Sequence, residues 1–177
     1  ATDAWQLSEA EMQGRRQIVD YMAFLRQEVP GFEQAEMAEI AAQVGVRETR
    51  RVHCLHMLDG DEVVSGASFD DSIGLNAWPI ESHVDGAIHW RHFNDPDNAF
   101  NQLPLRMLIP VSPAPANLWV AGRCAGMTHS GQSAARASGA CFAMGQAAGT
   151  AAAMSLSGPP DVTELQRRLR ANGAILD

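Results

Sequence analysis

The residues best suited to chemistry gather near the C-terminal end of this 177-residue chain, where Arg123, His129 and Arg136 follow one another among small residues. A histidine titrates near neutral pH and can pass a proton to or from a substrate oxygen. An arginine carries a permanent, forked charge that suits phosphates and carboxylates. A surface ion pair for Arg123, a helix-surface charge for Arg136 and a structural role for His129 are the alternative interpretations.

Two expected elements would position these side chains. Residues 117–121 form a short apolar run typical of a buried strand, which Gly122 closes. Most positions from 131 to 153 are Gly, Ala or Ser, and we expect one long helix there. A strand that leads into a helix through a glycine loop exposes backbone N–H groups at the positive end of the helix dipole. Such an end stabilises developing negative charge, and small side chains allow close approach to a sheet or cofactor. A plain packing helix is the competing interpretation.

Four motifs occupy this stretch in order. They are Val120-Ala121-Gly122-Arg123, Thr128-His129, the helix start before Arg136, and Gly145-Gln146-Ala147-Ala148-Gly149-Thr150-Ala151-Ala152. In type, order and spacing they resemble the closing segment of the FAD-dependent oxidoreductase family. Colinear upstream blocks also resemble that family: Pro30-Gly31-Phe32, Gly45-Val46-Arg47-Glu48-Thr49-Arg50-Arg51, Phe69-Asp70-Asp71-Ser72-Ile73 and Trp78-Pro79-Ile80-Glu81-Ser82-His83. The chain departs from the family pattern at Leu105, usually Tyr, at Glu81, usually Asp, and at Ala134-Ala135, usually Ser and an aliphatic residue.

The resemblance implies FAD as the cofactor and a set of site residues. The implied catalytic residues are His129 and Arg136. The implied cofactor-binding residues are Ala121, Gly122, Arg123, Cys124, Gln132, Ser133 and Ala134. Arg50, His83 and Arg106 are weaker candidates for substrate contact. The implied reaction is hydride transfer between a small organic substrate and FAD, with the helix N-terminus facing the N1–O2 edge of the flavin.

The expected fold is α/β: the C-terminal part of an FAD/NAD(P)-binding, Rossmann-like fold (residues 104–177) and part of a mixed α+β substrate or cap region (residues 1–103). The chain contains no GxGxxG motif to hold the ADP pyrophosphate, and it does not begin with methionine. We therefore expect a partner, an N-terminal GxGxxG-bearing half, supplied as a separate chain of a hetero-oligomer or as the rest of a clipped precursor. The alternatives are a non-catalytic subunit that completes a flavoenzyme, and a domain that binds a metal or another small molecule.

Composition narrows the class of protein. The formal net charge of −8 argues against a general nucleic-acid surface. The three cysteines lack CxxC spacing, which argues against a disulfide framework. The pairs His53/His56 and His89/His92 would share a face only if their segments were helical, and we predict no metal site. No signal peptide or membrane span is evident, and the predicted location is the cytoplasm.

Further elements follow from local signals. Ser8 and Glu11 form a capping-box pattern at the start of a helix expected over residues 8–29. Residues 33–42 favour helix, and residues 44–58 favour a strand or strand pair. Short helices are expected after Asp59 and over 69–77, a strand at 86–91, and a last helix opening at Asp161 or Thr163.

Overall fold

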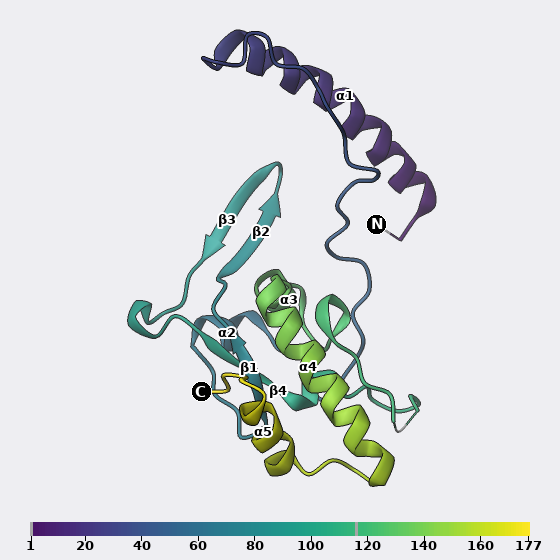
Figure 1. Cartoon of the computed structure of the whole chain (residues 1–177), viewed down its shortest axis with the longest axis vertical. Helices are drawn as coiled ribbons and strands as arrows, with labels where there is room; N and C mark the ends of the chain where they lie inside the picture. Colours follow the sequence, from purple (N-terminus) through teal and green to yellow (C-terminus); the bar gives the residue numbers. More distant parts are fainter. Residues whose placement is uncertain (1, 116) are drawn as a thin grey trace. The chain divides into compact units, whose positions relative to one another are not determined.

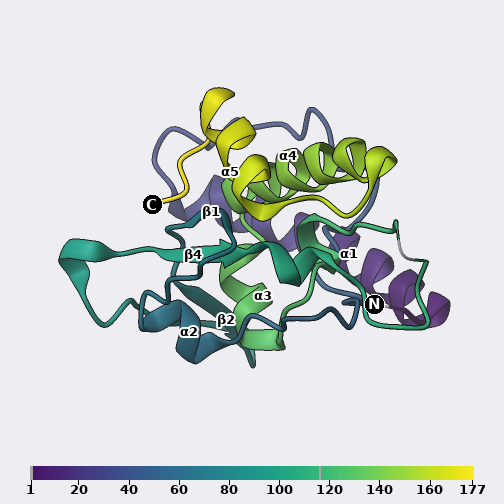
Figure 2. The same cartoon turned by 90° about the horizontal axis from the view of Figure 1, so that it is seen from below.

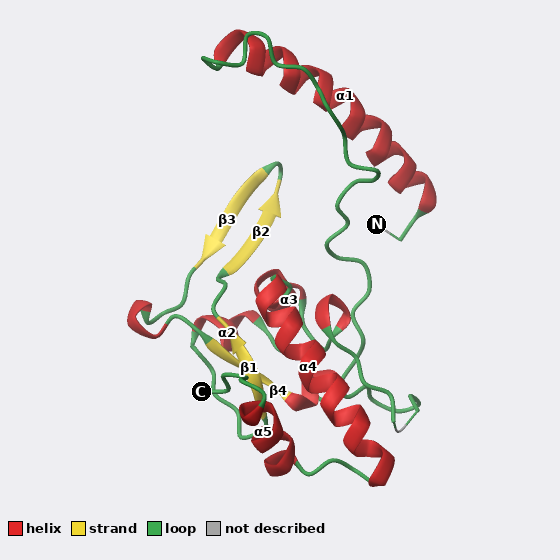
Figure 3. Ribbon diagram, viewed as in Figure 1, coloured by secondary structure: helices red, strands yellow, loops and turns green. Residues whose placement is uncertain are grey.

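The computed structural model describes residues 2–115 and 117–177 and divides into two compact units, residues 1–49 and residues 50–177. Figures 1 and 3 show the elements along the chain. The α-helices are α1 (Ala4–Glu28), α2 (Gly60–Val64), α3 (His129–Ala135), α4 (Ser138–Met154) and α5 (Val162–Ala171). The strands are β1 (Ser72–Asn76), β2 (Ile80–Val84), β3 (Ala87–Arg91) and β4 (Asn101–Pro104). The 3₁₀ turns are η1 (Pro96–Asn98), η2 (Leu105–Leu108), η3 (Gly122–Cys124) and η4 (Ser155–Ser157).

The first unit consists of α1 and an extended segment that contacts it. The predicted helix over 8–29 is confirmed, but it begins earlier, because the side chain of Asp3 caps it by accepting from the amide of Gln6. The predicted capping box is wrong: the hydroxyl of Ser8 donates to the carbonyl of Ala4 inside the helix, and Glu11 accepts from the amide of Val44 at 2.6 Å. No residue of α1 is buried, so this unit has little core of its own.

The predicted helix over 33–42 and the predicted strand or strand pair over 44–58 do not form. Residues 33–42 contain no helix in the structure. A segment of that length is marginal as an isolated helix, and its backbone is bonded instead to α1, where Arg26 donates to the carbonyl of Ala35 at 2.8 Å. In residues 44–58 the described pairing is limited to two single bridges, Cys54 with Pro110 and Leu58 with Met127.

The second unit contains two small antiparallel sheets rather than one large one. β1 pairs with β4, and β2 pairs with β3 as a hairpin that places Ile80 opposite Arg91 and Val84 opposite Ala87. Figure 1 shows the hairpin extending away from the β1–β4 pair, with α3 beside its base. The predicted strand at 86–91 is confirmed as β3. The predicted helix over 69–77 is wrong, because that stretch holds β1, whose burial is nearly continuous.

The core of the second unit lies between the β1–β4 pair and the helices. α4 packs closely on β1, since a Cβ at Gly74 would meet the Cβ of Ala143 at 2.7 Å. Figure 2 shows α4 and α5 along one side of the β1–β4 pair and α2 on the opposite side. The largest fully buried apolar side chains are Leu58, Ile73, Leu103, Met107, Leu108, Met127, Met144, Leu165, Leu169 and Leu176.

Two predicted helices at the ends of this unit are confirmed. α2 follows Asp59, which forms a complete capping box with Glu62. α5 follows Asp161, whose carboxylate accepts from the amide of Glu164 at 2.8 Å.

Two predictions near the expected site need correction. Residues 117–121 form no strand: in this stretch the backbone bond of Val120 goes to the carbonyl of Leu108, and a parallel strand needs a neighbour on which to pair. The single helix expected from residue 131 is two helices, because Ala137 has an extended backbone between α3 and α4. The fold is mixed α and β, and among the described residues the only parallel pairing is the Leu58–Met127 bridge. None of the described helices combines the length and apolar character needed to cross a membrane.

Candidate functional site

The carboxylate of Glu81 gathers three side chains from two elements. Nε2 of His83, two residues further along β2, lies 2.8 Å from Oε1 of Glu81. The indole Nε1 of Trp78 donates to Oε2 at 3.2 Å. The guanidinium of Arg136, at the end of α3, lies 4.0 Å from Oε1 and donates to the Glu81 backbone carbonyl at 3.4 Å. Two predicted site residues, His83 and Arg136, are thus brought together through a carboxylate that was not among the predicted site residues.

This arrangement fixes the charge state of Glu81. Its pKa is lowered, chiefly by the hydrogen bond with His83, while partial burial acts in the opposite direction and Trp78 and Arg136 lower it further. An ionised carboxylate that accepts hydrogen bonds from oriented donors is favoured over the neutral acid. Glu81 is therefore a fixed negative charge that orients both His83 and Arg136.

Aromatic side chains flank this carboxylate. Trp90 lies directly opposite Glu81 across the hairpin. The rings of Trp78 and Trp90 meet edge to face at 6.0 Å, and His92 stacks on Trp90 at 6.2 Å with an interplanar angle of 19°. We name the set Trp78, Glu81, His83, Trp90 and Arg136 the hairpin cluster. Sequence reasoning missed Trp78, Glu81 and Trp90 because residues 80–85 gave no strand signal, although residues two apart in a strand share a face.

The break between α3 and α4 places Arg136 at a junction. Arg136 is the C-cap of α3, and Ala137, with φ −61° and ψ 149°, is the N-cap of α4 without a side-chain cap bond. The thiol of Cys141 donates to the carbonyl of Arg136 at 3.3 Å. Ser138 and Gly139 begin α4, and both are exposed. Serine and glycine are weak helix formers inside a helix, which explains why a new helix starts here.

The predicted turn Gly122-Arg123-Cys124 lies beside the start of α4. Gly122 has φ +70°, and a Cβ there would lie 3.9 Å from Sγ of Cys141 in the first turns of α4. Arg123 and Cys124 are exposed. Burial raises the pKa of the Cys141 thiol, and the nearby positive charge of Arg123 opposes that shift. We name residues 122–124 and Ser138–Gly139 the turn–helix junction.

The other predicted cofactor residues are placed differently. Ala121 is half-buried and precedes the turn. The side chains of Gln132, Ser133 and Ala134 lie inside the second unit, and Ser133 donates to the carbonyl of His129 at 2.9 Å. His129 is the first residue of α3, and the hydroxyl of Thr128 caps that helix. The roles assigned to these residues stay predictions.

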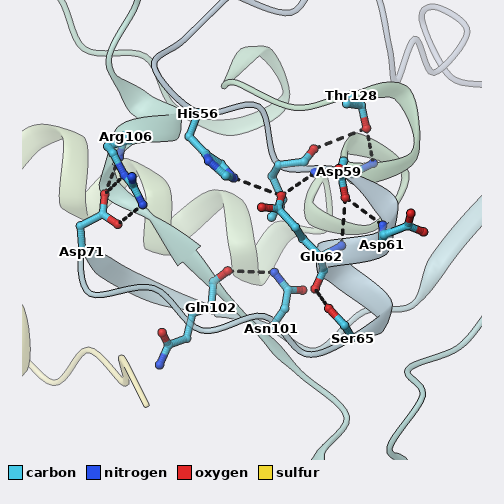
Figure 4. Close-up of polar contacts among 12 residues, drawn as sticks. His56, Asp59, Asp61, Glu62, Ser65, Asp71, Asn101, Gln102, Arg106 and Thr128 are labelled. Atoms are coloured by element: carbon cyan, nitrogen blue, oxygen red, sulfur yellow. Dashed lines mark hydrogen bonds and ion pairs between the residues drawn. The ribbon is translucent and has the colours of Figure 1, made fainter.

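The two weaker arginine candidates lie outside the hairpin cluster. Arg50 is exposed in a segment without regular structure. Arg106 makes a two-pronged bond with the buried carboxylate of Asp71, at 3.0 Å and 3.1 Å (Figure 4). Asp71 also accepts from the backbone amide of Arg106, so this pair anchors η2 to the start of β1. The pair lines a cavity of about 630 Å³ that also contains Trp119 and Pro160.

A second histidine–carboxylate pair supports α2. Nε2 of His56 lies 3.1 Å from Oε2 of Glu62, which also accepts from the amide of Asp59 (Figure 4). His56 thus extends the capping box of a structural helix. Within residues 2–115 and 117–177, no group of three or more His, Cys, Asp or Glu side chains could hold a metal ion.

Comparison with known proteins matches most of the chain to a family model. Residues 1–171 match the profile of a family described as FAD dependent oxidoreductase. Neither the curated proteins nor the solved structures contain a significant match to the chain.

Proposed function

We propose, because the chain belongs to the FAD-dependent oxidoreductase family, that it forms the flavin-ring side of an enzyme that moves hydride between a small organic substrate and FAD. The family binds FAD. The chemistry must therefore be assigned to residues that could face an isoalloxazine ring on one side and a substrate on the other.

The turn–helix junction fits the polar edge of a flavin. The first amides of a helix have no acceptor within the helix, and here they belong to Ser138 and the exposed Gly139. A Cβ placed on Gly139 would meet nothing within 4 Å, so the protein leaves open space against this turn. Arg123 adds a permanent positive charge beside it. Accessible donors, a helix N-terminus and a cation together suit a group on which negative charge develops.

The residues of the chain then have distinct roles. When bound, FAD supplies a two-electron acceptor that takes a hydride from the substrate. The amides of Ser138 and Gly139, with Arg123, would hold and stabilise the anionic edge of the ring. Arg136 and His83 would hold the substrate on the other side, and Glu81 would keep both side chains in place.

Arg136 is the observation that carries this proposal. Its guanidinium belongs to the hairpin cluster, and its backbone leads through Ala137 into the first turn of α4. The substrate-side cluster and the flavin-side junction are therefore adjacent and linked by covalent structure. Hydride transfer needs this arrangement, because the donor carbon and the ring must be held together.

The ADP part of FAD needs a binding site on a partner. In this class of fold the ADP pyrophosphate is held by a glycine-rich turn, and the chain has no GxGxxG sequence. We propose that a GxGxxG-bearing half supplies this part, either as a second chain or as another part of a longer polypeptide. The backbone of residues 117–121, which belongs to none of the described strands, would offer that half an edge for pairing.

Co-purification tests the proposal. The chain is expressed together with a GxGxxG-bearing half of the same family encoded next to it, and the visible absorbance of the complex is recorded. We expect bound flavin, and we expect Arg123→Gln to weaken its retention. Arg170→Gln, which removes an arginine paired with Asp177 at the far C-terminal end, is the matched control. A stable complex without flavin would contradict the proposal and would indicate that the chain is a non-catalytic subunit.

A further inference from the structure

One face of the β2–β3 hairpin combines polar and aromatic side chains. Residues opposite each other in an antiparallel pair project to the same side, as do residues two apart. Glu81 lies opposite Trp90, and His83 lies opposite Ile88. These four side chains therefore share one face of the hairpin.

The indoles on this face are open to solvent. Trp78 and Trp90 are each 45% exposed, although their rings contact each other at 6.0 Å. The bond from Trp78 to Glu81 fixes one indole, and the stacked ring of His92 supports the other. Large aromatic surfaces that are held in place but left uncovered mark an interaction site.

The carboxylate and the guanidinium of the hairpin cluster offset each other's charge. The Glu81 carboxylate and the Arg136 guanidinium, whose side chains are 15% and 14% exposed, compensate each other at 4.0 Å. Neither a carboxylate ligand nor an ammonium ligand would find an unbalanced charge here. Carboxylate oxygens and imidazole nitrogens, in contrast, are good partners for hydroxyl groups.

We propose that the hairpin cluster binds a neutral polyhydroxylated ring, a sugar or cyclic polyol, as the substrate of the flavin reaction. The apolar C–H face of such a ring would lie on Trp90 and Trp78, and its hydroxyls would bond to Glu81 and His83. The inference rests on the proposed function for its reaction, but its binding part stands on the hairpin alone.

His83 is the proton acceptor in this reaction. An imidazole can accept a proton, and Nε2 of His83 lies 2.8 Å from the carboxylate of Glu81. Oxidation of a ring alcohol breaks one C–H bond and one O–H bond and forms a C=O bond. The hydride would pass to the flavin and the proton to the imidazole of His83, and Glu81 would stabilise the imidazolium that results.

Binding can be measured without the cofactor. Saturation-transfer NMR on the full chain with methyl β-D-glucopyranoside should show transfer to the axial ring protons. Trp90→Ala should weaken binding at least about tenfold, and Trp90→Phe should restore part of it. Trp5→Ala, which removes a tryptophan that is 85% exposed on α1, should change nothing. Circular dichroism shows whether each variant is folded.

Other results would overturn the inference. Transfer that is equal in the folded Trp90→Ala chain, no transfer to any neutral pyranoside or inositol, or preferential binding of benzoate would each contradict it. In the flavin-loaded complex, His83→Gln should slow flavin reduction at saturating pyranoside by a larger factor than it weakens the NMR affinity. A complex that binds flavin but no polyol refutes only the present inference, whereas a chain that binds the pyranoside but never flavin refutes only the proposed function.

Discussion

At the scale of single residues, Glu81 decides the geometry of the hairpin cluster. Its two oxygens accept from His83 and Trp78, and its charge balances Arg136. Resemblance to the family pointed to His83 and Arg136, but nothing in the sequence placed them together. Their contact depends on the hairpin register and on the end of α3, which are tertiary features.

Replacing Glu81 with Gln should make the melting temperature depend less on pH in the acid range. The folded-state pKa of Glu81 lies below its ordinary value of 4.5, so its stabilising contribution is complete above that value and is lost as the pH falls through the lowered pKa. We expect the melting temperature of the wild type to fall more steeply below pH 4.5 than that of Glu81→Gln. Thermal unfolding followed from neutral to acid pH measures this, with Glu9→Gln on α1 as control. Parallel profiles for wild type and Glu81→Gln would contradict the assignment.

The cysteines should differ sharply in reactivity. Burial raises the pKa of the Cys54 thiol to about 11, and its side chain is buried, whereas Cys124 is exposed. Because the thiolate is the reactive form, iodoacetamide should modify Cys124 first and leave Cys54 unmodified until the chain unfolds. Peptide mass mapping over time checks the order. Equal rates at the two positions in the folded chain would show that Cys54 is not enclosed as described.

At the scale of elements, the break between α3 and α4 changes the expected site. The small-residue composition of residues 131–153 predicted helix correctly over most of its length. It could not show that Ala137 is extended, because that depends on where Arg136 and Cys141 find partners. The helix N-terminus beside Gly122 is consequently that of α4. The buried positions Gln132 to Ala134 belong to α3 instead.

Two helix glycines should respond in opposite directions to alanine. A Cβ at Gly145 would meet nothing, so Gly145→Ala should raise the free energy of unfolding by about 0.5–1 kcal/mol through helix propensity. A Cβ at Gly131 would overlap the backbone carbonyl of Leu58, so Gly131→Ala should lower it by roughly 2 kcal/mol or more. Urea unfolding of the full chain measures both values. A loss of stability in Gly145→Ala would show that another surface covers this face of α4.

Local signals predicted some elements and failed at others for a physical reason. Capping residues correctly located α2 and α5, because this signal acts within a few residues. Most of α1 was also predicted, although its expected capping box does not form and Asp3 caps it instead. The strands predicted within residues 44–58 and over residues 117–121 do not form, because a strand needs a second backbone to pair with. β2 and β4 were missed, since each is short and is defined by its partner strand.

At the scale of the whole molecule, the core is confined to the second unit. Every buried hydrophobic residue among those described lies between Cys54 and Leu176. The predicted division into a substrate region up to residue 103 and a cofactor region after it stays a prediction. The elements of both regions form one compact unit after residue 50.

This distribution predicts the outcome of limited proteolysis. Arg47 and Arg50 lie near the boundary between the units, in a segment without regular structure, and Arg50 is exposed. Trypsin should cut there first and leave a resistant fragment of residues 51–177, because exposed segments with few buried contacts open most readily. Mass spectrometry of the digest and a cooperative melt of the fragment check this. Early cleavage inside the second unit, at Arg106 or Arg136, would contradict it.

The affinity for FAD of two matched glycine variants tests the central assignment most directly. Gly139 lies in the first turn of α4, and Gly149 lies about 15 Å further along the same helix; a Cβ added at either position would meet no neighbouring atom within 4 Å. In the complex with the GxGxxG-bearing half, Gly139→Leu should raise the Kd for FAD at least about tenfold, because the new side chain fills the space assigned to the ring edge. Gly149→Leu should bind FAD like the wild type. Unchanged affinity in a folded Gly139→Leu complex would show that the flavin does not lie at the start of α4.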